Sequence, residues 1–357
     1  MVEFHRLEIA LRDSVSGEVR FDRGMRAAYS ADASNYRQVP IGVVLPRTAE
    51  DVVAAMRVCA SHGVPVLAHG GATSLNGQTV NVAVVIDCSK YLNRVLSIDA
   101  PARLARVEPG VVCDALRDAA EAHGLTFAPD PATHSRCTLG GMIGNNSCGP
   151  HSVMAGKTVE NIERLEVLTY DGARFWCGPT PSFDGIGGRQ AEIYRKLKAI
   201  ADKYGDAIRA GFPKIKRRVS GYNLDQLLSE NGFNVARALV GTEGTCALTL
   251  QAEARLVKSP PHRVLVVLAF PDIYAAGDAV PQVLAAGPIA CEGLDEAIIG
   301  GLRERGLRLE DIKLLPAGKA WLMVEFGADT QEQAIEKAKA LSPDVNTDKT
   351  FISRLWT

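Results

Sequence analysis

The chain has 357 residues, of which 46% are hydrophobic and 23% charged, with a formal net charge of −1. These values are typical of a globular protein with two or more domains. The near-neutral charge gives no electrostatic reason to expect binding to nucleic acid or to an anionic membrane. No apolar run approaches the ~20 residues that cross a membrane.

The eight cysteines are scattered singly, without a C-x-x-C pair. In a chain of this length that pattern is typical of reduced thiols in a cytosolic protein. It predicts no structural zinc and no iron–sulfur cluster within these residues. The first six residues lack a basic-then-apolar signal pattern. We therefore expect a cytoplasmic protein, and leave open peripheral attachment to the inner face of the membrane.

The first part of the chain predicts a small α/β lobe. Residues 1–40 are polar and mixed, and we interpret them as an N-terminal extension. A buried strand is expected at 41–46, then a helix at 49–62 that Thr48 caps and Gly63 ends. The apolar stretch 64–69 runs into a loop rich in glycine and hydroxyl residues at 70–77, and another strand follows at 82–87.

The loop at 70–77 is suited to an anion, because glycine lets consecutive backbone N–H groups approach it. It is not a Walker loop, since no Lys-Ser or Lys-Thr pair follows its glycines. A Rossmann turn must open a crossover helix, and the next strand begins too soon after Gly77 to leave room for one. The sequence therefore predicts strand, anion-binding loop and strand.

A second lobe is expected from residue 98 onward. A strand at 104–108 and a helix at 113–123 lead into the proline-rich stretch 127–136. A second loop of small residues follows at 137–149, and then a hairpin of strands at 163–170 and 174–177. After a helix at 191–210 and a basic run at 214–218, a third glycine turn at 240–245 feeds a strand at 246–256.

The character of the chain changes after the Ser-Pro-Pro at 259–261. Strands are expected at 264–270, 289–294 and 321–326, and helices at 273–284 and 331–341. This pattern predicts a separate α+β unit. We expect the chain to stop inside that unit, with residues 351–357 as an interrupted element.

The three glycine loops, in this order and within an α/β frame, resemble the FAD-binding domain of the vanillyl-alcohol oxidase and p-cresol methylhydroxylase superfamily. Within it the chain is similar to FAD-linked 2-hydroxyacid dehydrogenases of the D-2-hydroxyglutarate and D-lactate type, in the large form with a C-terminal iron–sulfur domain. The resemblance covers roughly residues 20 to 341. It implies an α+β fold with a two-lobed FAD-binding domain at 41–256 (lobes at about 41–97 and 98–256) and a truncated substrate or cap domain at 257–357.

The resemblance also assigns residues to non-covalent FAD. The first loop matches the family's pyrophosphate loop, which comprises His69, Gly70, Gly71, Ala72, Thr73, Ser74, Leu75, Asn76 and Gly77. The family usually has arginine where this chain has His69, so a charge-assisted phosphate contact is expected to be weaker here. The stretch along the ribityl chain and flavin ring matches Pro129, Asp130, Thr138, Gly140, Gly141, Gly144, Asn145, Asn146 and Gly149. Ile162 matches a main-chain contact to adenine, and Glu243 a turn beside the flavin.

Assignments for the substrate are fewer. The segment 216–222 resembles the stretch that carries a carboxylate-binding arginine, for which Arg217 and Arg218, with Ser220, are the candidates; a solvated basic face is the alternative. His134 and His151 flank the flavin loop and are either acid/base groups or structural histidines. Catalytic residues stay unassigned, because the family's base, metal-binding histidines and iron–sulfur motif belong to regions absent from this chain.

The resemblance implies an oxidoreductase that oxidises a D-2-hydroxy acid of the 2-hydroxyglutarate, lactate or glycolate class to the 2-oxo acid, by hydride transfer to flavin N5. Its electron acceptor is expected to be a quinone, an electron-transfer flavoprotein or an iron–sulfur domain, and a homodimer is compatible with the sequence. We expect this chain to bind FAD and to turn over poorly alone. The alternatives are a non-catalytic FAD-binding subunit or fragment that needs a partner, and an NADPH-dependent flavoenzyme similar to the enolpyruvyl reductases.

Overall fold

The computed structural model describes residues 4–180, 182–341 and 350–353. The chain divides into two compact units. The first unit comprises Met1–Cys148 and Lys157–Val257, and the second comprises Gly149–Gly156 and Lys258–Thr357. The division near residue 257 lies beside the boundary expected from the sequence, whereas the short segment 149–156 leaves the first unit for the second.

The first unit begins with a four-stranded sheet in the order β1-β2-β4-β3. Its strands are β1 (Glu18–Arg20), β2 (Gly42–Leu45), β3 (Val66–His69) and β4 (Val84–Asp87). Both β2 and β3 run parallel to β4, and β1 is antiparallel to β2. All residues of β2 and β4 are buried, as expected for parallel strands with both faces covered.

The first forty residues are part of this lobe in the structure. They supply α1 (His5–Ser14), β1 and α2 (Arg23–Ala28). Leu7 and Leu11 of α1 pack in the same core as Val52 and Met56 of α3 (Ala49–Ser61). The interpretation as an extension missed these elements, because a polar segment that buries only a few side chains has no long apolar period.

The loop after β3 is itself the crossover between two adjacent parallel strands. Register pairs His69 with Asp87, so the carboxyl ends of β3 and β4 lie side by side. The connecting residues 70–83 are all described and contain no helix. The predicted absence of a crossover helix is therefore correct, and a loop alone carries the chain from the carboxyl end of β3 to the amino end of β4.

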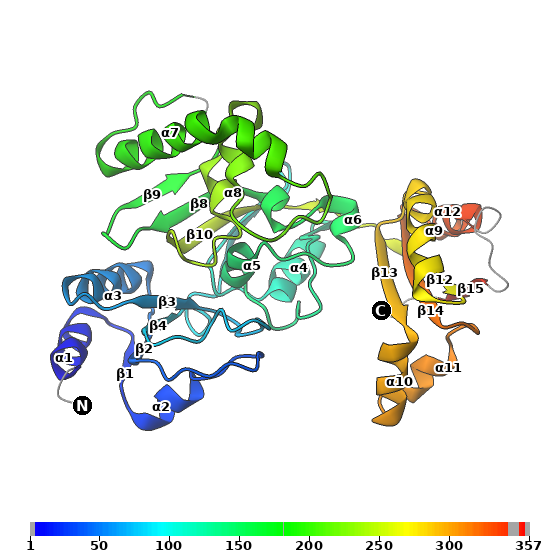
Figure 1. Ribbon diagram of the computed structural model, residues 1–357, viewed down its shortest axis with the longest axis horizontal. Helices are drawn as coiled ribbons and strands as arrows, with labels where there is room; N and C mark the ends of the chain where they lie inside the picture. Colours follow the sequence, from blue (N-terminus) through cyan, green and yellow to red (C-terminus); the bar gives the residue numbers. More distant parts are fainter. Residues whose placement is uncertain (1–3, 181, 342–349, 354–357) are drawn as a thin grey trace. The chain divides into compact units, whose positions relative to one another are not determined.

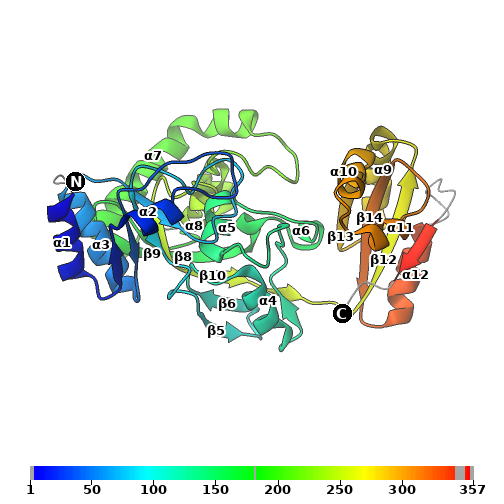
Figure 2. The same ribbon diagram turned by 90° about the horizontal axis from the view of Figure 1, so that it is seen from below.

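The second sheet of the first unit is antiparallel, in the order β5-β6-β10-β8-β9; Figure 2 shows β5, β6 and β10 side by side. Its strands are β5 (Val95–Asp99), β6 (Leu104–Val107), β8 (Ile162–Leu168), β9 (Arg174–Cys177) and β10 (Leu248–Arg255). The helices beside it are α4 (Cys113–Glu121), α5 (Leu139–Asn145), α7 (Gly188–Gly211) and α8 (Val235–Leu239). In Figure 1 the long α7 covers β8 and β9, and Tyr194 of this helix is buried in the shared core.

The stretch 137–149, expected to be a loop, contains the helix α5. Thr138 caps it by accepting a hydrogen bond from the N–H of Gly141, and Asn146 ends it in the left-handed conformation. Glycines disfavour a helix here, but Leu139, Met142 and Ile143 are buried in the core. Tertiary packing therefore overrides the weak local propensity.

The second unit is an antiparallel sheet in the order β13-β14-β12-β15 with helices on both faces. Its elements are α6 (Ser152–Ala155), β12 (His262–Phe270), α9 (Ile273–Ala285), β13 (Ala290–Asp295), α10 (Glu296–Glu304), α11 (Leu309–Lys313), β14 (Ala320–Ala328), α12 (Gln331–Leu341) and β15 (Thr350–Ser353). One face packs against α9 and α12, and the other against α10 and α11. The interrupted element expected at 351–357 lies partly outside the described residues. The described residues also contain a two-stranded pair, β7 (Leu125–Thr126) with β11 (Val257–Lys258).

None of the helices in the described ranges has the length and apolar content needed to cross a bilayer.

Candidate functional site

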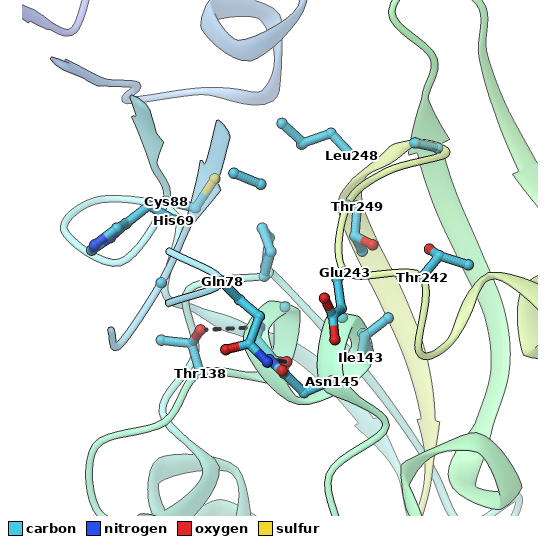
Figure 3. Close-up of a pocket in the computed structure, with 18 of the residues that line it drawn as sticks. His69, Gln78, Cys88, Thr138, Ile143, Asn145, Thr242, Glu243, Leu248 and Thr249 are labelled. Atoms are coloured by element: carbon cyan, nitrogen blue, oxygen red, sulfur yellow. Dashed lines mark hydrogen bonds between the residues drawn. The ribbon is translucent and has the colours of Figure 1, made fainter. Parts of the chain in front are cut away.

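The three glycine-rich segments meet at one pocket of the first unit, which has an empty volume of about 810 Å³ (Figure 3). Residues from the loop after β3, from α5 and from the turn at 242–244 line it. Eight residues assigned to FAD from the sequence are in its lining: His69, Gly70, Thr138, Gly140, Gly141, Gly144, Asn145 and Glu243.

His69 ends β3 and lines the pocket, but its imidazole is directed away from Glu243 on the opposite wall (Figure 3). The ring packs against Tyr29, with 5.0 Å between the ring centroids. Its Nδ1 lies 3.8 Å from Oδ1 of Asp87 and makes no hydrogen bond. The side chain is therefore part of a buried cluster beneath the loop, and a phosphate contact would have to come from the backbone of this residue.

Asp87 is the anion of that cluster. Its side chain is 6% exposed, and it accepts hydrogen bonds from the Tyr29 hydroxyl (2.6 Å) and from the N–H of Ser89 (2.7 Å). Burial alone would raise the pKa of Asp87. The neighbouring His69 and these hydrogen bonds outweigh burial, so the pKa of Asp87 lies below its ordinary value. Burial and the bond to Asp87 raise the pKa of Tyr29.

Two glycines of the first loop are required by packing against the second loop. A Cβ on Gly70 would lie 2.1 Å from Oγ1 of Thr138, and a Cβ on Gly71 would lie 2.4 Å from the carbonyl oxygen of Arg136. Both contacts are closer than real side chains allow. The explanation from the sequence, close approach to an anion, is therefore incomplete: these glycines also let the two loops pack together.

The rest of the first loop is not in the pocket lining. Residues 71–77 lie outside it, while Gln78 and Thr79, which were not assigned from the sequence, are in it. Gly77 has φ +77° and faces the ring of Tyr36. Contacts of Ala72, Thr73, Ser74, Leu75, Asn76 and Gly77 with a diphosphate remain a prediction.

Glycines on α5 differ in what surrounds them. A Cβ on Gly140 would lie 2.9 Å from Cβ of Pro109, so this glycine is also required by packing. By contrast, a Cβ on Gly144 would meet only Cα of Glu243, at 3.7 Å, and one on Gly141 would meet Thr138 at 3.4 Å. Since Gly141 and Gly144 line the pocket, their missing side chains leave room that a ligand can use.

The third turn is joined to α5 by backbone hydrogen bonds. The N–H of Gly241 donates to the carbonyl of Ile143 (2.8 Å), and the N–H of Glu243 donates to the carbonyl of Gly144 (3.0 Å). Glu243 has φ +52°, a left-handed conformation that non-glycine residues rarely adopt. This strained residue supplies the carboxylate that lines the pocket.

Five further assigned residues lie outside the lining. Asn146 is fully buried, and its side-chain oxygen accepts from the N–H of Val159. Ile162 is fully buried, and its carbonyl oxygen accepts from Nε of Arg237 (3.2 Å). Pro129 and Asp130 are buried in the first unit. Gly149 belongs to the second unit.

The substrate candidates Arg217, Arg218 and Ser220 are also outside the pocket lining. Arg218 donates to Oδ1 of Asp225 (2.7 Å), and its guanidinium lies 4.3 Å from the ring centroid of Phe212. Arg217 and Ser220 are exposed. Arg218 thus has structural partners, and the substrate role of all three residues remains a proposal.

The two flanking histidines have carboxylate partners. His134 Nδ1 lies 2.7 Å from Oδ2 of Asp114 in the first unit. In the second unit, His151 Nε2 lies 3.2 Å from Oε2 of the buried Glu325. Neither histidine lines the pocket.

The remaining lining residues were not assigned to FAD from the sequence. They are Ala68, Gln78, Thr79, Cys88, Pro109, Ile143, Val167, Leu239, Thr242, Gly244, Ala247, Leu248 and Thr249. Burial raises the pKa of the Cys88 thiol to about 12, so this thiol is neutral at ordinary pH. No spacing rule connects these positions, because β4 belongs to the first sheet and β8 and β10 to the second, and these strands come together only in the folded unit.

The pocket fits FAD by its construction. Gly141, Gly144 and Gly244 present open backbone to it, and a Cβ on Gly244 would meet nothing closer than Ala68 at 3.9 Å. The hydroxyls of Thr79 and Thr138 and the amide of Asn145 supply polar contacts among apolar walls. Within the described ranges no group of three or more histidine, cysteine or acidic residues could hold a metal ion.

Comparison with known proteins agrees with this construction. Residues 40–178 match the family described as FAD binding domain, and residues 259–349 match the C-terminal domain of FAD linked oxidases. A solved structure, of alkyldihydroxyacetonephosphate synthase, superposes with a TM-score of 0.68 at 15% identity, covering 98% of this chain and 61% of that one. This last likeness concerns the fold alone, and the p-cresol methylhydroxylase type of FAD-binding fold predicted from the sequence is confirmed.

Curated relatives are oxidoreductases of hydroxy acids by name. A D-2-hydroxyglutarate dehydrogenase of Pseudomonas putida is 31% identical over 303 residues, which are 81% of this chain and 30% of that protein. Glycolate oxidase subunit GlcD of Bacillus subtilis is 29% identical over 338 residues, 92% of this chain and 61% of that protein. The chain therefore spans about a third of the first relative and about three fifths of the second.

Proposed function

Because the chain belongs to the FAD-linked oxidases, we propose that it is the FAD-binding part of a dehydrogenase that oxidises a 2-hydroxy acid to the 2-oxo acid. The observation that carries the proposal is the pocket at which all three glycine-rich segments meet, the first two of which lie in the residues that match an FAD binding domain. The names of the longer relatives supply the substrate class, which includes 2-hydroxyglutarate and glycolate.

In this proposal the first loop binds the diphosphate, and α5 and the third turn lie along the flavin. Backbone N–H groups of this loop would donate to the phosphate oxygens, and no imidazolium would be required from His69. Gly141 and Gly144 admit the ribityl chain and ring, because a side chain at either position would occupy pocket volume. Asn145 supplies an amide at the same wall.

Bound FAD supplies a two-electron acceptor for the hydride of the substrate α-carbon. The chain's own contribution is to hold and orient the cofactor. Glu243 is the carboxylate of the described pocket lining, and the left-handed turn fixes its backbone against α5. The Cys88 thiol stays neutral because burial raises its pKa to about 12.

A second candidate, a non-catalytic FAD-binding unit, is favoured by one observation. No lysine or arginine is in the described lining of the pocket, so these residues offer no cation for a substrate carboxylate. Arg217, Arg218 and Ser220 remain the proposed binding residues for the substrate carboxylate, in a part of the substrate site outside this pocket. The second unit is proposed as the substrate cap.

The D configuration of the substrate, the electron acceptor, a homodimer and a cytoplasmic location are parts of the proposal that rest on the family resemblance. The acceptor is a quinone, an electron-transfer flavoprotein or an iron–sulfur domain. A direct test follows the visible spectrum of the FAD-reconstituted chain during anaerobic addition of D-2-hydroxyglutarate, D-lactate and glycolate. Bleaching by one acid supports the dehydrogenase, and flavin that no acid bleaches supports the non-catalytic unit. Bleaching by NADPH alone would contradict both and favour a reductase.

A further inference from the structure

The loop that carries the proposed diphosphate site has little support of its own. In residues 70–83, all of which are described, the internal backbone hydrogen bond is a long one, from the N–H of Val80 to the carbonyl of Gly77 (3.4 Å). Two further N–H groups bond to nearby side chains, Asn76 to Gln78 and Val82 to Asn81. Such a loop keeps one conformation only if neighbouring segments hold it, since its backbone entropy opposes order.

One neighbour is the second loop, through the contacts of Gly70 and Gly71 described above. The other is the segment of residues 29–38, which we call the bracing segment. Asp32 Oδ2 accepts from the hydroxyl of Thr79 (2.9 Å) and, at 3.4 Å, from its N–H. Oδ1 of the same carboxylate accepts from the N–H of Ser34 (2.9 Å), which fixes its orientation.

Two more contacts join the bracing segment to the loop. The N–H of Ala33 donates to the carbonyl of Ala72 (3.1 Å). The ring of Tyr36 covers Gly77, where a Cβ would come within 2.8 Å of it. The segment therefore contacts the loop at Ala72, at Gly77 and at Thr79.

Thr79 connects these contacts to the pocket, because it lines the pocket and is held by Asp32. The bracing segment lies before residue 40, where the match to the FAD binding domain family begins. Its contribution is therefore additional to the matched region.

We propose that residues 29–38 hold the 70–83 loop in its FAD-binding conformation, and that Asp32 is a positioning residue for FAD that acts through Thr79. The inference rests on the proposed function. A loop already ordered before binding loses less entropy when the cofactor arrives, so the bracing segment raises affinity without touching FAD. The two side chains act as one unit, which makes the effects of their substitutions non-additive.

A double-mutant cycle on the full chain tests this directly, with FAD titrated against the apoprotein by quenching of flavin fluorescence. Asp32→Ala and Thr79→Val are each expected to raise the Kd for FAD about tenfold, and the double variant no more than the larger single effect. The matched control is Asp99→Ala, which removes another carboxylate that accepts a backbone N–H, in the turn before β6. An unchanged Kd for Asp32→Ala, or multiplying effects in the double variant, would overturn the proposal.

Hydrogen exchange of the FAD-free chain separates this inference from the proposed function. Amides of residues 70–83 are expected to exchange about tenfold faster in Asp32→Ala than in the unmodified chain, and no faster in Asp99→Ala. If the unmodified chain binds no FAD, the proposed function fails. Faster exchange in Asp32→Ala would still show that the bracing segment orders the loop. Equal exchange in all three proteins would contradict the proposal that the bracing segment orders the loop.

Discussion

Oγ1 of Thr138 occupies the space that a side chain on Gly70 would need, since a Cβ there would lie 2.1 Å from it. This contact joins the loop after β3 to the cap of α5, so the first two glycine-rich segments form one packed structure. Gly70→Ala is expected to lower the free energy of unfolding by about 1–3 kcal/mol through overpacking, and to weaken FAD binding. Thermal unfolding and FAD titration measure the two effects.

The double variant Gly70→Ala/Thr138→Ser provides the control. Serine keeps the hydroxyl that caps α5 and removes only the methyl group, so the hydroxyl must still move and little stability should return. The double variant Gly70→Ala/Thr138→Ala removes the clashing hydroxyl, but it also removes the cap of α5. Loss of that cap costs about 1 kcal/mol of stability. A Gly70→Ala variant as stable as the unmodified chain would show that the loops are not packed as described.

Gly144→Ala is expected to act in the opposite way on stability. Its Cβ would meet only Glu243 Cα at 3.7 Å, and alanine favours a helix over glycine by about 1 kcal/mol. The apoprotein should therefore be as stable as the unmodified chain or slightly more so, while FAD binds at least tenfold more weakly because the methyl group enters the pocket. Gly140→Ala, which would clash with Pro109, is the matched control and should destabilise. Unchanged FAD affinity in Gly144→Ala would place the flavin elsewhere.

Tyr29→Phe removes a 2.6 Å hydrogen bond to the buried Asp87. An unsatisfied buried acceptor costs about 1–3 kcal/mol, so this variant should lose that much unfolding free energy at neutral pH. Tyr91→Phe is the control, because the hydroxyl of Tyr91 donates to the more exposed Glu18 and its loss should cost less. Equal losses in the two variants would argue against a buried cluster beneath the loop.

The same cluster predicts a pH dependence. Burial acts to raise the pKa of Asp87, but its neighbouring His69 and its hydrogen bonds hold that pKa below the ordinary value of about 4. A carboxyl whose pKa is lower in the folded state stabilises the fold above its unfolded pKa, and this contribution is lost as pH falls through the folded pKa. The stability difference between the unmodified chain and Tyr29→Phe should therefore be largest at neutral pH and narrow in acid, as measured by denaturant unfolding. A difference that grows on acidification would contradict the assignment.

Arg218→Ala is expected to cost about 1–2 kcal/mol of stability, because Arg218 both pairs with Asp225 and stacks on Phe212. Arg217→Ala, at an exposed position, should change stability by no more than about 0.5 kcal/mol. Chemical denaturation compares the two. If Arg217→Ala raises the concentration of hydroxy acid needed to bleach the flavin while leaving stability unchanged, Arg217 is the better candidate for the carboxylate clamp.

Regular elements with long periods could be predicted from the sequence. The helix expected at 49–62 is α3 (Ala49–Ser61), and the helix expected at 331–341 is α12 (Gln331–Leu341). Both have an apolar stripe at helical spacing, which local pattern alone can identify. The helix α5 was missed, because its three glycines disfavour helix while the burial of Leu139, Met142 and Ile143 is a property of the whole fold.

The part of the candidate site that the glycine-rich segments form could be predicted from the sequence. Gly141 and Gly144 were assigned from the sequence and line the pocket with open backbone. Asn146 was assigned from the family resemblance, yet it ends α5 in the left-handed conformation and is fully buried. Thr79 was not assigned, because its place in the pocket depends on parallel β3 and β4 and on a hydrogen bond to Asp32, distant in the sequence.

The most direct test of the account is the visible absorption spectrum of the purified chain after reconstitution with FAD and removal of free flavin, for the unmodified chain and for Gly144→Ala. We expect stoichiometric bound flavin in the unmodified chain and little in Gly144→Ala, although both are folded. A folded, unmodified chain that retains no flavin would contradict the proposed function, and equal retention by the two proteins would contradict the proposed place of FAD.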